Sequence, residues 1–124
     1  MYNYGKPIIW RKEAKRMSTI SHLEALAEEF KVLGDKTRLR ILSLLKGREL
    51  CVCDLTEVLE ISQPAVSQHM RRLRQGGFVN ERRAGQWIYY SLHMENQRVV
   101  LLLPMFLKVE EDEERLAFAK GCKA

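Results

Sequence analysis

The chain has 124 residues and a formal net charge of +5 at neutral pH, and 46% of its residues are hydrophobic and 30% are charged. This length fits one small domain, and this composition is typical of a globular rather than a disordered chain. The positive charge favours a polyanionic partner such as nucleic acid, although a generic basic protein is an alternative that charge alone does not exclude. The apolar runs are too short for a signal peptide or a membrane span, so we expect a cytoplasmic protein without membrane association.

Residues 1–18 carry five basic side chains and no clear apolar period, which indicates a basic N-terminal arm. These side chains are Lys6, Arg11, Lys12, Lys15 and Arg16. We consider two roles for the arm. It is either an additional contact to DNA or to a second protomer, or a solvated tail.

Two helices open the main domain, which we place at residues 19–109. An apolar stripe of helical spacing follows a capping-box pattern at Ser21, which predicts a helix over residues 21–33. Asp35 is the predicted N-cap of a second helix, which has a wide apolar face and ends at Gly47.

The next two predicted helices, over residues 51–59 and 62–75, are separated by a short turn. Ser62 is a suitable N-cap, and Pro64 falls in the first turn, where a missing N–H is tolerated. This arrangement predicts a helix-turn-helix whose second helix enters a DNA groove. Its outer face offers Gln63, Ala65, Ser67 and Gln68 to base edges, and Arg71, Arg72 and Arg74 to the phosphate backbone. The alternative is a solvated helix face in an interaction module.

After Gly77 the helical spacing of apolar residues ends, and the sequence becomes rich in β-branched and aromatic residues. Residues 78–83 and 86–92 are predicted to form a β-hairpin around Ala84 and Gly85. Arg82 and Arg83 lie near its tip and are expected to reach phosphates or the minor groove. The fold class that we expect is therefore mainly α with a β-hairpin wing, an α+β winged helix-turn-helix.

The last apolar segment, residues 95–107, is predicted to be a helix that Pro104 kinks or interrupts. It carries more apolar surface than a monomer needs, so we expect it to pair with the first helix in a dimer seam. A two-fold homodimer would place two recognition helices roughly 34 Å apart on an inverted-repeat DNA operator. Residues 110–124 are predicted to be an acidic C-terminal tail or short helix that ends in Cys122, with the acidic run 110–114 as a solvated face.

Two of the three cysteines, Cys51 and Cys53, stand at the predicted start of the third helix. On a regular helix, side chains two residues apart point about 200° apart, so one ion can bind both thiols only if the helix start is distorted. Such a distortion would reach the recognition helix, which suggests a switch. The structural alternative is that both cysteines are small apolar fillers. We expect no enzyme, because the chain has no Cys-x-x-Cys, no phosphate-binding loop and no base near a nucleophile.

Four segments together resemble the ArsR/SmtB family of winged helix-turn-helix, metal-responsive repressors. They are Leu33 to Leu42, Glu49 to Leu55, Ser62 to His69 and Gly85 to Tyr90. The resemblance implies a dimer that holds an operator when it is ligand-free and releases the operator when it binds a toxic ion. The Cys-Val-Cys-Asp-Leu segment further resembles the arsenical-responsive branch, which binds trivalent arsenic or antimony through thiolates and needs no cofactor for DNA binding.

The chain departs from this branch at Thr56, where similar repressors often carry a third cysteine. Soft ions select thiolates, and a hydroxyl is a poor substitute. Cys122 is then the candidate third ligand beside Cys51 and Cys53, from the same protomer or from its partner. A small cellular thiol or solvent is the alternative third ligand.

A redox or reactive-sulfur switch is the second function considered, with Cys51 or Cys53 bridged to Cys122.

Overall fold

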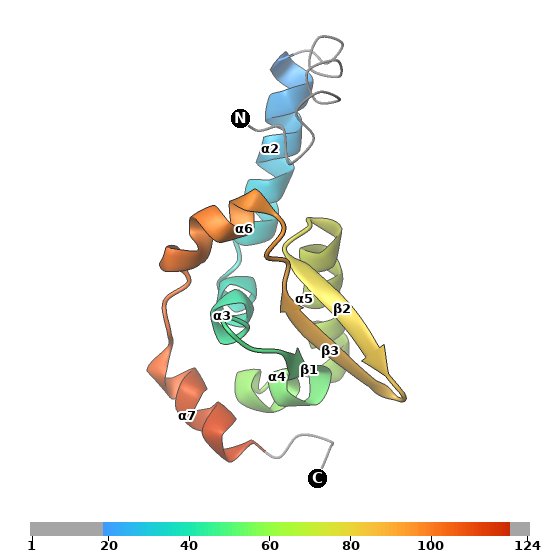
Figure 1. Ribbon diagram of the computed structural model, residues 1–124, viewed down its shortest axis with the longest axis vertical. Coiled ribbons are helices and arrows are strands. Elements are labelled where there is room, and N and C mark those ends of the chain that lie inside the picture. Colours follow the sequence, from blue (N-terminus) through green and yellow to red (C-terminus); the bar gives the residue numbers. More distant parts are fainter. Residues whose placement is uncertain (1–18, 120–124) are drawn as a thin grey trace.

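A computed structural model describes residues 19–119 of the chain (Figure 1). The elements follow the order α2 (Thr19–Leu33), α3 (Lys36–Leu44), β1 (Leu50–Cys51), α4 (Val52–Leu59), α5 (Gln63–Gln75), β2 (Val79–Ala84), β3 (Trp87–Leu92), α6 (Gln97–Leu102), the 3₁₀ turn η1 (Leu103–Met105) and α7 (Glu110–Phe118). The mainly helical winged helix-turn-helix expected from the sequence is confirmed. No helix within residues 19–119 is long and apolar enough to cross a membrane.

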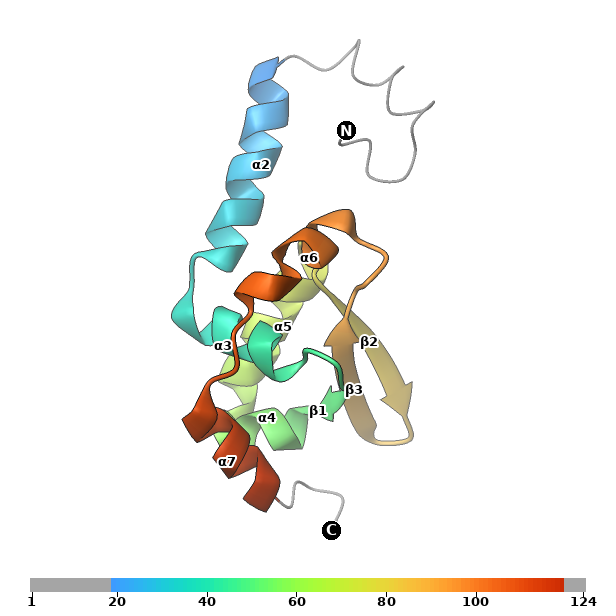
Figure 2. The same ribbon diagram turned by 60° about the vertical axis from the view of Figure 1, so that its left-hand side comes forward.

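The core lies between the helix-turn-helix, α3 and the sheet. Its fully buried side chains include Ile41, Leu42, Leu55, Val58, Val66, Met70, Leu73, Phe78 and Val99. Helix α2 projects away from this body, and the β2–β3 hairpin leaves it in another direction (Figures 1 and 2). Since burial of apolar surface drives folding, the helix-turn-helix is the best anchored part of the described chain.

Side-chain caps that the sequence predicts set the starts of α3 and α5. The Asp35 carboxylate accepts a hydrogen bond from the backbone N–H of Arg38 at 2.9 Å, and Ser62 Oγ accepts one from Ala65 at 3.3 Å. Both predicted N-caps are therefore confirmed. The first predicted cap is wrong, because α2 already includes Thr19 and Ser21 lies inside the helix. Arg38 ends α2 by donating from Nε to the carbonyl of Val32 at 2.6 Å.

The sheet has three strands in the order β1-β3-β2, not the two of the expected hairpin. Leu50 pairs with Tyr90 and Cys51 with Tyr89 in antiparallel register. The third helix, expected from about residue 51, begins at Val52, and Cys51 has extended backbone angles (φ −87°, ψ 164°) and serves as the N-cap of α4. A strand of two residues is too short to show the alternation by which strands are recognised in a sequence.

The C-terminal elements confirm one expectation and correct another. Helix α6 ends at Leu102, and Pro104 lies in the 3₁₀ turn that follows, so the predicted interruption is observed. The acidic run belongs to α7, but it is not wholly solvated. Asp112 is 1% exposed and accepts two hydrogen bonds from Arg40, at 2.7 and 3.0 Å, and Glu113 pairs with Arg48. These ion pairs join α7 to α3 and to the turn that follows α3, and α7 also packs against α4.

Candidate functional site

The Cys51 thiol is built into the start of α4. It is 1% exposed and accepts a hydrogen bond from the backbone N–H of Asp54 at 3.4 Å. The Asp54 carboxylate in turn accepts from the thiol at 3.1 Å and from the backbone N–H of Cys51 at 3.2 Å. This is a capping box in which sulfur takes the place of the usual hydroxyl. The thiol therefore has a structural role at the helix start in addition to any ligand chemistry.

Both cysteines line one cavity of about 270 Å³. Val52 and Gln63 from the helix-turn-helix and Gln86, Trp87 and Ile88 from the hairpin complete its walls. The angle of about 200° expected between side chains two apart on a regular helix does not apply to this pair, because Cys51 precedes the helix. The cavity brings the cysteine pair, the first residue of the recognition helix α5 and the wing together.

The two cysteines differ in their bonding. Cys51 carries a thiol, whereas Cys53 is disulfide-bonded. Cys122, the third predicted ligand, lies outside the described residues. Thr56 donates its hydroxyl to the carbonyl of Val52 at 2.7 Å, so this hydroxyl serves the helix backbone. Within residues 19–119, no three His, Cys, Asp or Glu side chains form a group that could hold a metal ion.

Helix α5 presents a polar face opposite its buried one. Val66, Met70 and Leu73 point into the core. The predicted DNA-contacting side chains of α5 are exposed, except for half-buried Ala65; the exposed ones are Gln63, Ser67, Gln68, Arg71, Arg72 and Arg74. The half-buried His69 faces α3, with its Nδ1 3.3 Å from Arg38.

The arginines near this face differ in their partners. In the part of the chain that the structure describes, Arg71 and Arg72 form no ion pair, whereas Arg74 pairs with Glu81 at 3.0 Å. Arg71 and Arg72 are therefore the cations of α5 that are available to a polyanion.

The two wing arginines, in contrast, are each paired within the chain. Arg82 makes two hydrogen bonds to the Glu49 carboxylate, at 2.7 and 2.9 Å, and lies 4.6 Å from the centre of the Tyr89 ring. Arg83 pairs with Glu81 at 3.2 Å. The bond to Glu49 raises the pKa of Arg82. Sequence reasoning missed Glu49, because its partner lies 33 residues along the chain and no local pattern joins the two.

Comparisons with known proteins agree with this geometry. The sequence model described as "Bacterial regulatory protein, arsR family" matches residues 35–81. The structure of reduced HlyU from Vibrio cholerae is similar, with 32% identity and a TM-score of 0.58 over 71% of this chain and 95% of that chain. The chain belongs to the ArsR family of bacterial regulatory proteins. The family match spans the described chain from the cap of α3 to β2, and so includes both cysteines and all of α5.

Other ArsR-family relatives carry more specific names. The "Arsenic resistance transcriptional regulator ArsR1" of Pseudomonas putida is 52% identical over 67 residues, which cover 53% of this chain and 52% of that protein. A homodimeric winged helix-turn-helix domain from Mycobacterium bovis is 27% identical, with a TM-score of 0.62 over 72% of this chain and 82% of that chain. This chain spans only 52% to 62% of the length of the first curated relatives that it matches.

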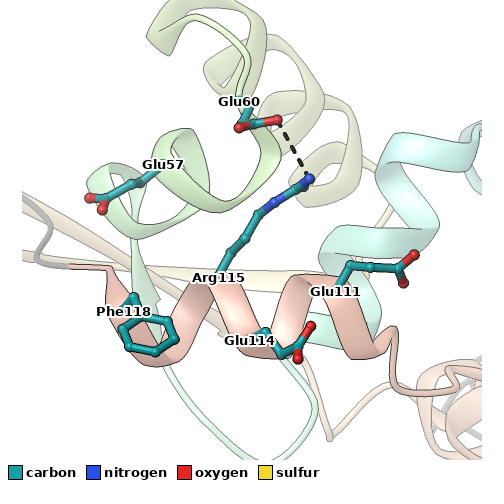
Figure 3. A pocket seen from close by; sticks show the side chains of 6 residues that line it. All are labelled: Glu57, Glu60, Glu111, Glu114, Arg115 and Phe118. Atoms are coloured by element: carbon teal, nitrogen blue, oxygen red, sulfur yellow. Dashed lines mark ion pairs between the residues drawn. The ribbon is translucent and has the colours of Figure 1, made fainter.

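A second cavity of this ArsR-family chain, of about 440 Å³, lies between α4 and α7 (Figure 3). Its lining is strongly acidic and consists of Glu57, Glu60, Glu111, Glu114, Arg115 and Phe118. Arg115 crosses it toward Glu60, 3.7 Å away, and donates to the carbonyl of Val58 at 3.3 Å. Among the described residues, no sulfur or imidazole lines this cavity, and its contacts dock α7 on α4.

Large apolar side chains remain exposed on α2 and on the α6–η1 segment, which covers residues 97–107. They are Ile20, Leu23, Phe30, Val100, Leu101, Met105 and Leu107. Leu101 is 76% exposed, whereas the neighbouring Val99 is buried in the core. A segment that is apolar on both its inner and its outer side is typical of an element that also packs against another chain.

Proposed function

We propose that the chain is a DNA-binding transcriptional repressor that releases its operator on binding trivalent arsenic or antimony through cysteine thiolates. The observation that carries this proposal is the cavity shared by Cys51 and Cys53, the first residue of the recognition helix and the wing. A ligand held by the thiols would contact both DNA-reading elements. Family membership and the name of the Pseudomonas relative support the same function.

The proposed DNA surface consists of the exposed face of α5 and the tip of the wing. Gln63, Ala65, Ser67 and Gln68 are proposed to contact base edges, and Arg71, Arg72, Arg82 and Arg83 to contact the backbone. Affinity for DNA should fall steeply with salt, because each phosphate contact releases bound counterions.

The inducing ion is proposed to replace the hydrogen bonds of the Cys51 thiol. A thiolate is the form that binds a soft ion, so Cys51 must lose the proton that it donates to Asp54. The cap of α4 then weakens, and α4 leads through a short turn into α5. Cys53 must first be reduced, and Cys122 is proposed as the third ligand, with a small cellular thiol as the alternative. The ion shifts the DNA equilibrium only by the difference between its affinities for the two states.

The proposed repressor is a homodimer. The exposed apolar side chains of α2 and of the α6–η1 segment would form the seam between protomers. The winged helix-turn-helix domain of the Mycobacterium bovis relative is homodimeric, which supports this assembly. Two recognition helices would then read two half-sites of an inverted repeat.

Operator binding with and without arsenite, under reducing conditions, tests this function. Genomic fragments enriched by the wild-type protein would supply the operator. We expect arsenite to release the wild type, and we expect Cys51→Ser and Cys53→Ser to bind DNA without responding to arsenite. Cys122→Ser distinguishes the third ligand, because a small thiol as ligand would leave its response intact. Release by arsenite that survives in both Cys51→Ser and Cys53→Ser would contradict the proposal.

One observation favours a second function, a thiol-switch regulator of the same fold. Cys53 is disulfide-bonded. Forming such a bond removes two protons and two electrons from two thiols, and hydrogen peroxide as oxidant would be reduced to two waters. DNA release by peroxide but not by arsenite, reversed by a thiol reductant, would establish this function in place of the first.

A further inference from the structure

The wing contains an arginine whose surroundings match those of a phosphate-binding group. The guanidinium of Arg82 lies over the ring of Tyr89, 4.6 Å from its centre, and this contact fixes its plane. Its Nε and Nη2 atoms point at Glu49 and donate to the two carboxylate oxygens at 2.9 and 2.7 Å. A guanidinium binds a phosphate through the same pair of parallel hydrogen bonds. The Glu49 carboxylate therefore occupies the place that a phosphate oxygen pair would take.

The pair is exposed and can be opened. The side chain of Arg82 is 56% exposed and that of Glu49 is 36% exposed. Exposed ion pairs are weak and are further weakened by salt, so a DNA phosphate can compete with this carboxylate for the guanidinium. The other wing arginine, Arg83, pairs with Glu81, and Glu81 also pairs with Arg74. The carboxylate beside Arg83 is therefore divided between two guanidinium groups.

The sheet fixes the position of Glu49 relative to the wing. Cys51 is paired with Tyr89, and Tyr89 is paired with Arg82, so the three residues form one row across β1, β3 and β2. Directly paired residues point to the same face of a sheet. Glu49 lies two residues before Cys51 and so points to the same face of the sheet as Arg82. The short strand β1, which carries the Cys51 thiol, therefore places Glu49 next to Arg82.

We propose that Arg82 and Tyr89 form a binding site for one DNA phosphate, and that Glu49 fills this site in the DNA-free protein and lowers DNA affinity by competing for it. This inference rests on the proposed function, because it requires the wing to meet DNA. It adds a residue, Glu49, that opposes binding. The contact is to the backbone, so the competition is independent of DNA sequence.

Glu49→Gln tests the competition with a labelled duplex of mixed sequence, about 30 base pairs or three helical turns long. Glutamine keeps the shape of the side chain but releases Arg82 from the ion pair. We expect several-fold tighter binding at low salt, and a plot of log affinity against log salt that is steeper by about 0.9, the value for one added phosphate contact. Glu114→Gln on α7, across the molecule from the wing, is the control with the same change in charge (Figure 1).

A double-mutant cycle with Arg82→Gln separates competition from a general charge effect. If Glu49 acts through Arg82, then in the Arg82→Gln background Glu49→Gln changes DNA affinity no more than Glu114→Gln does. Two results would overturn the inference while leaving the proposed function intact. In the first, Glu49→Gln increases DNA affinity equally with and without Arg82. In the second, Glu49→Gln increases DNA affinity no more than Glu114→Gln does. Absence of salt-dependent DNA binding in the wild type would overturn both.

Discussion

At the scale of single residues, Cys51 combines a structural and a chemical role that different substitutions separate. Its sulfur caps α4 through Asp54, and its thiol lines the cavity shared with Cys53 and Gln63. A hydroxyl can perform the first role but is a poor ligand for a soft ion. The sulfur is therefore required only for the proposed ligand chemistry.

We predict that Cys51→Ser keeps the stability of the wild type but loses the response to arsenite. Cys51→Ala should also lose the response and should in addition be less stable by about 0.5–2 kcal/mol, because the α4 cap is removed. Urea unfolding followed by circular dichroism checks the stabilities, and DNA binding with arsenite checks the response. Equal stability of the serine and alanine variants would show that the thiol does not act as a cap.

A second prediction concerns Asp35 and the stability of the protein at acid pH. Its hydrogen bond from the backbone N–H of Arg38 lowers the pKa of this carboxyl below its ordinary value. The folded state thus binds the proton less readily than the unfolded state, so this contribution to stability is complete above a pH of about 4 and is lost as the pH falls through the lowered pKa.

Asp35→Ala should reduce the free energy of unfolding by about 0.5–2 kcal/mol at neutral pH, and by less at acid pH, where the wild-type carboxyl is already protonated. Urea unfolding between pH 3 and pH 7 measures this, with Asp35→Asn as the control, because asparagine keeps a neutral cap. A difference between wild type and Asp35→Ala that does not shrink at low pH would contradict the role given to the carboxylate.

At the scale of elements, a buried ion pair holds α7 on α3. Asp112 is almost fully buried; Arg40 on α3 is its hydrogen-bonded partner at 2.7 Å, and Arg115 on α7 lies 3.9 Å away. Removal of one member of a buried pair leaves an uncompensated charge. The position of α7 depends on this contact.

We predict that Arg40→Ala destabilises the protein by about 3 kcal/mol, because Asp112 is left buried without its partner. Glu28→Ala, which removes the exposed pair with Lys31, should change stability by less than about 1 kcal/mol and serves as the control. Thermal and urea unfolding provide the comparison. An Arg40→Ala variant as stable as the control would show that the buried pair does not anchor α7.

Local signals explain which elements the sequence predicted correctly. Asp35 and Ser62 were recognisable as caps, and Pro104 as an interruption, because each acts on residues a few positions away. The winged helix-turn-helix followed from apolar periodicity and turn residues in the same way. The cysteine pair was also recognisable, because both members lie in one short segment.

The features that the sequence did not predict depend on partners far along the chain. Strand β1 exists because Leu50 and Cys51 meet β3, and Asp112 is buried because Arg40 reaches it across 72 residues. Neither contact leaves a periodic trace in the sequence. The extended backbone of Cys51, just before the helix, was not predicted for the same reason, since it goes with the pairing to Tyr89 on β3.

At the scale of the whole molecule, the exposed apolar surface predicts the assembly state. We expect the wild type to sediment as a dimer at micromolar concentration and Leu101→Glu to sediment as a monomer, because a charge would be placed in the proposed seam. Phe118→Glu is the matched control, since Phe118 on α7 is 83% exposed but lies outside that surface. A dimeric Leu101→Glu variant, or a monomeric Phe118→Glu variant, would place the interface elsewhere.

The most direct test of the central proposal combines DNA release with a measurement of the bound ion. Reduced protein on a labelled operator is titrated with arsenite, and sulfur coordination of arsenic is measured on the same samples by X-ray absorption. We predict release of DNA together with arsenic–sulfur coordination in the wild type, and loss of both in Cys51→Ser and Cys53→Ser. Release of DNA without arsenic–sulfur coordination, or unchanged release in both serine variants, would contradict the proposal that the Cys51–Cys53 cavity is the sensor.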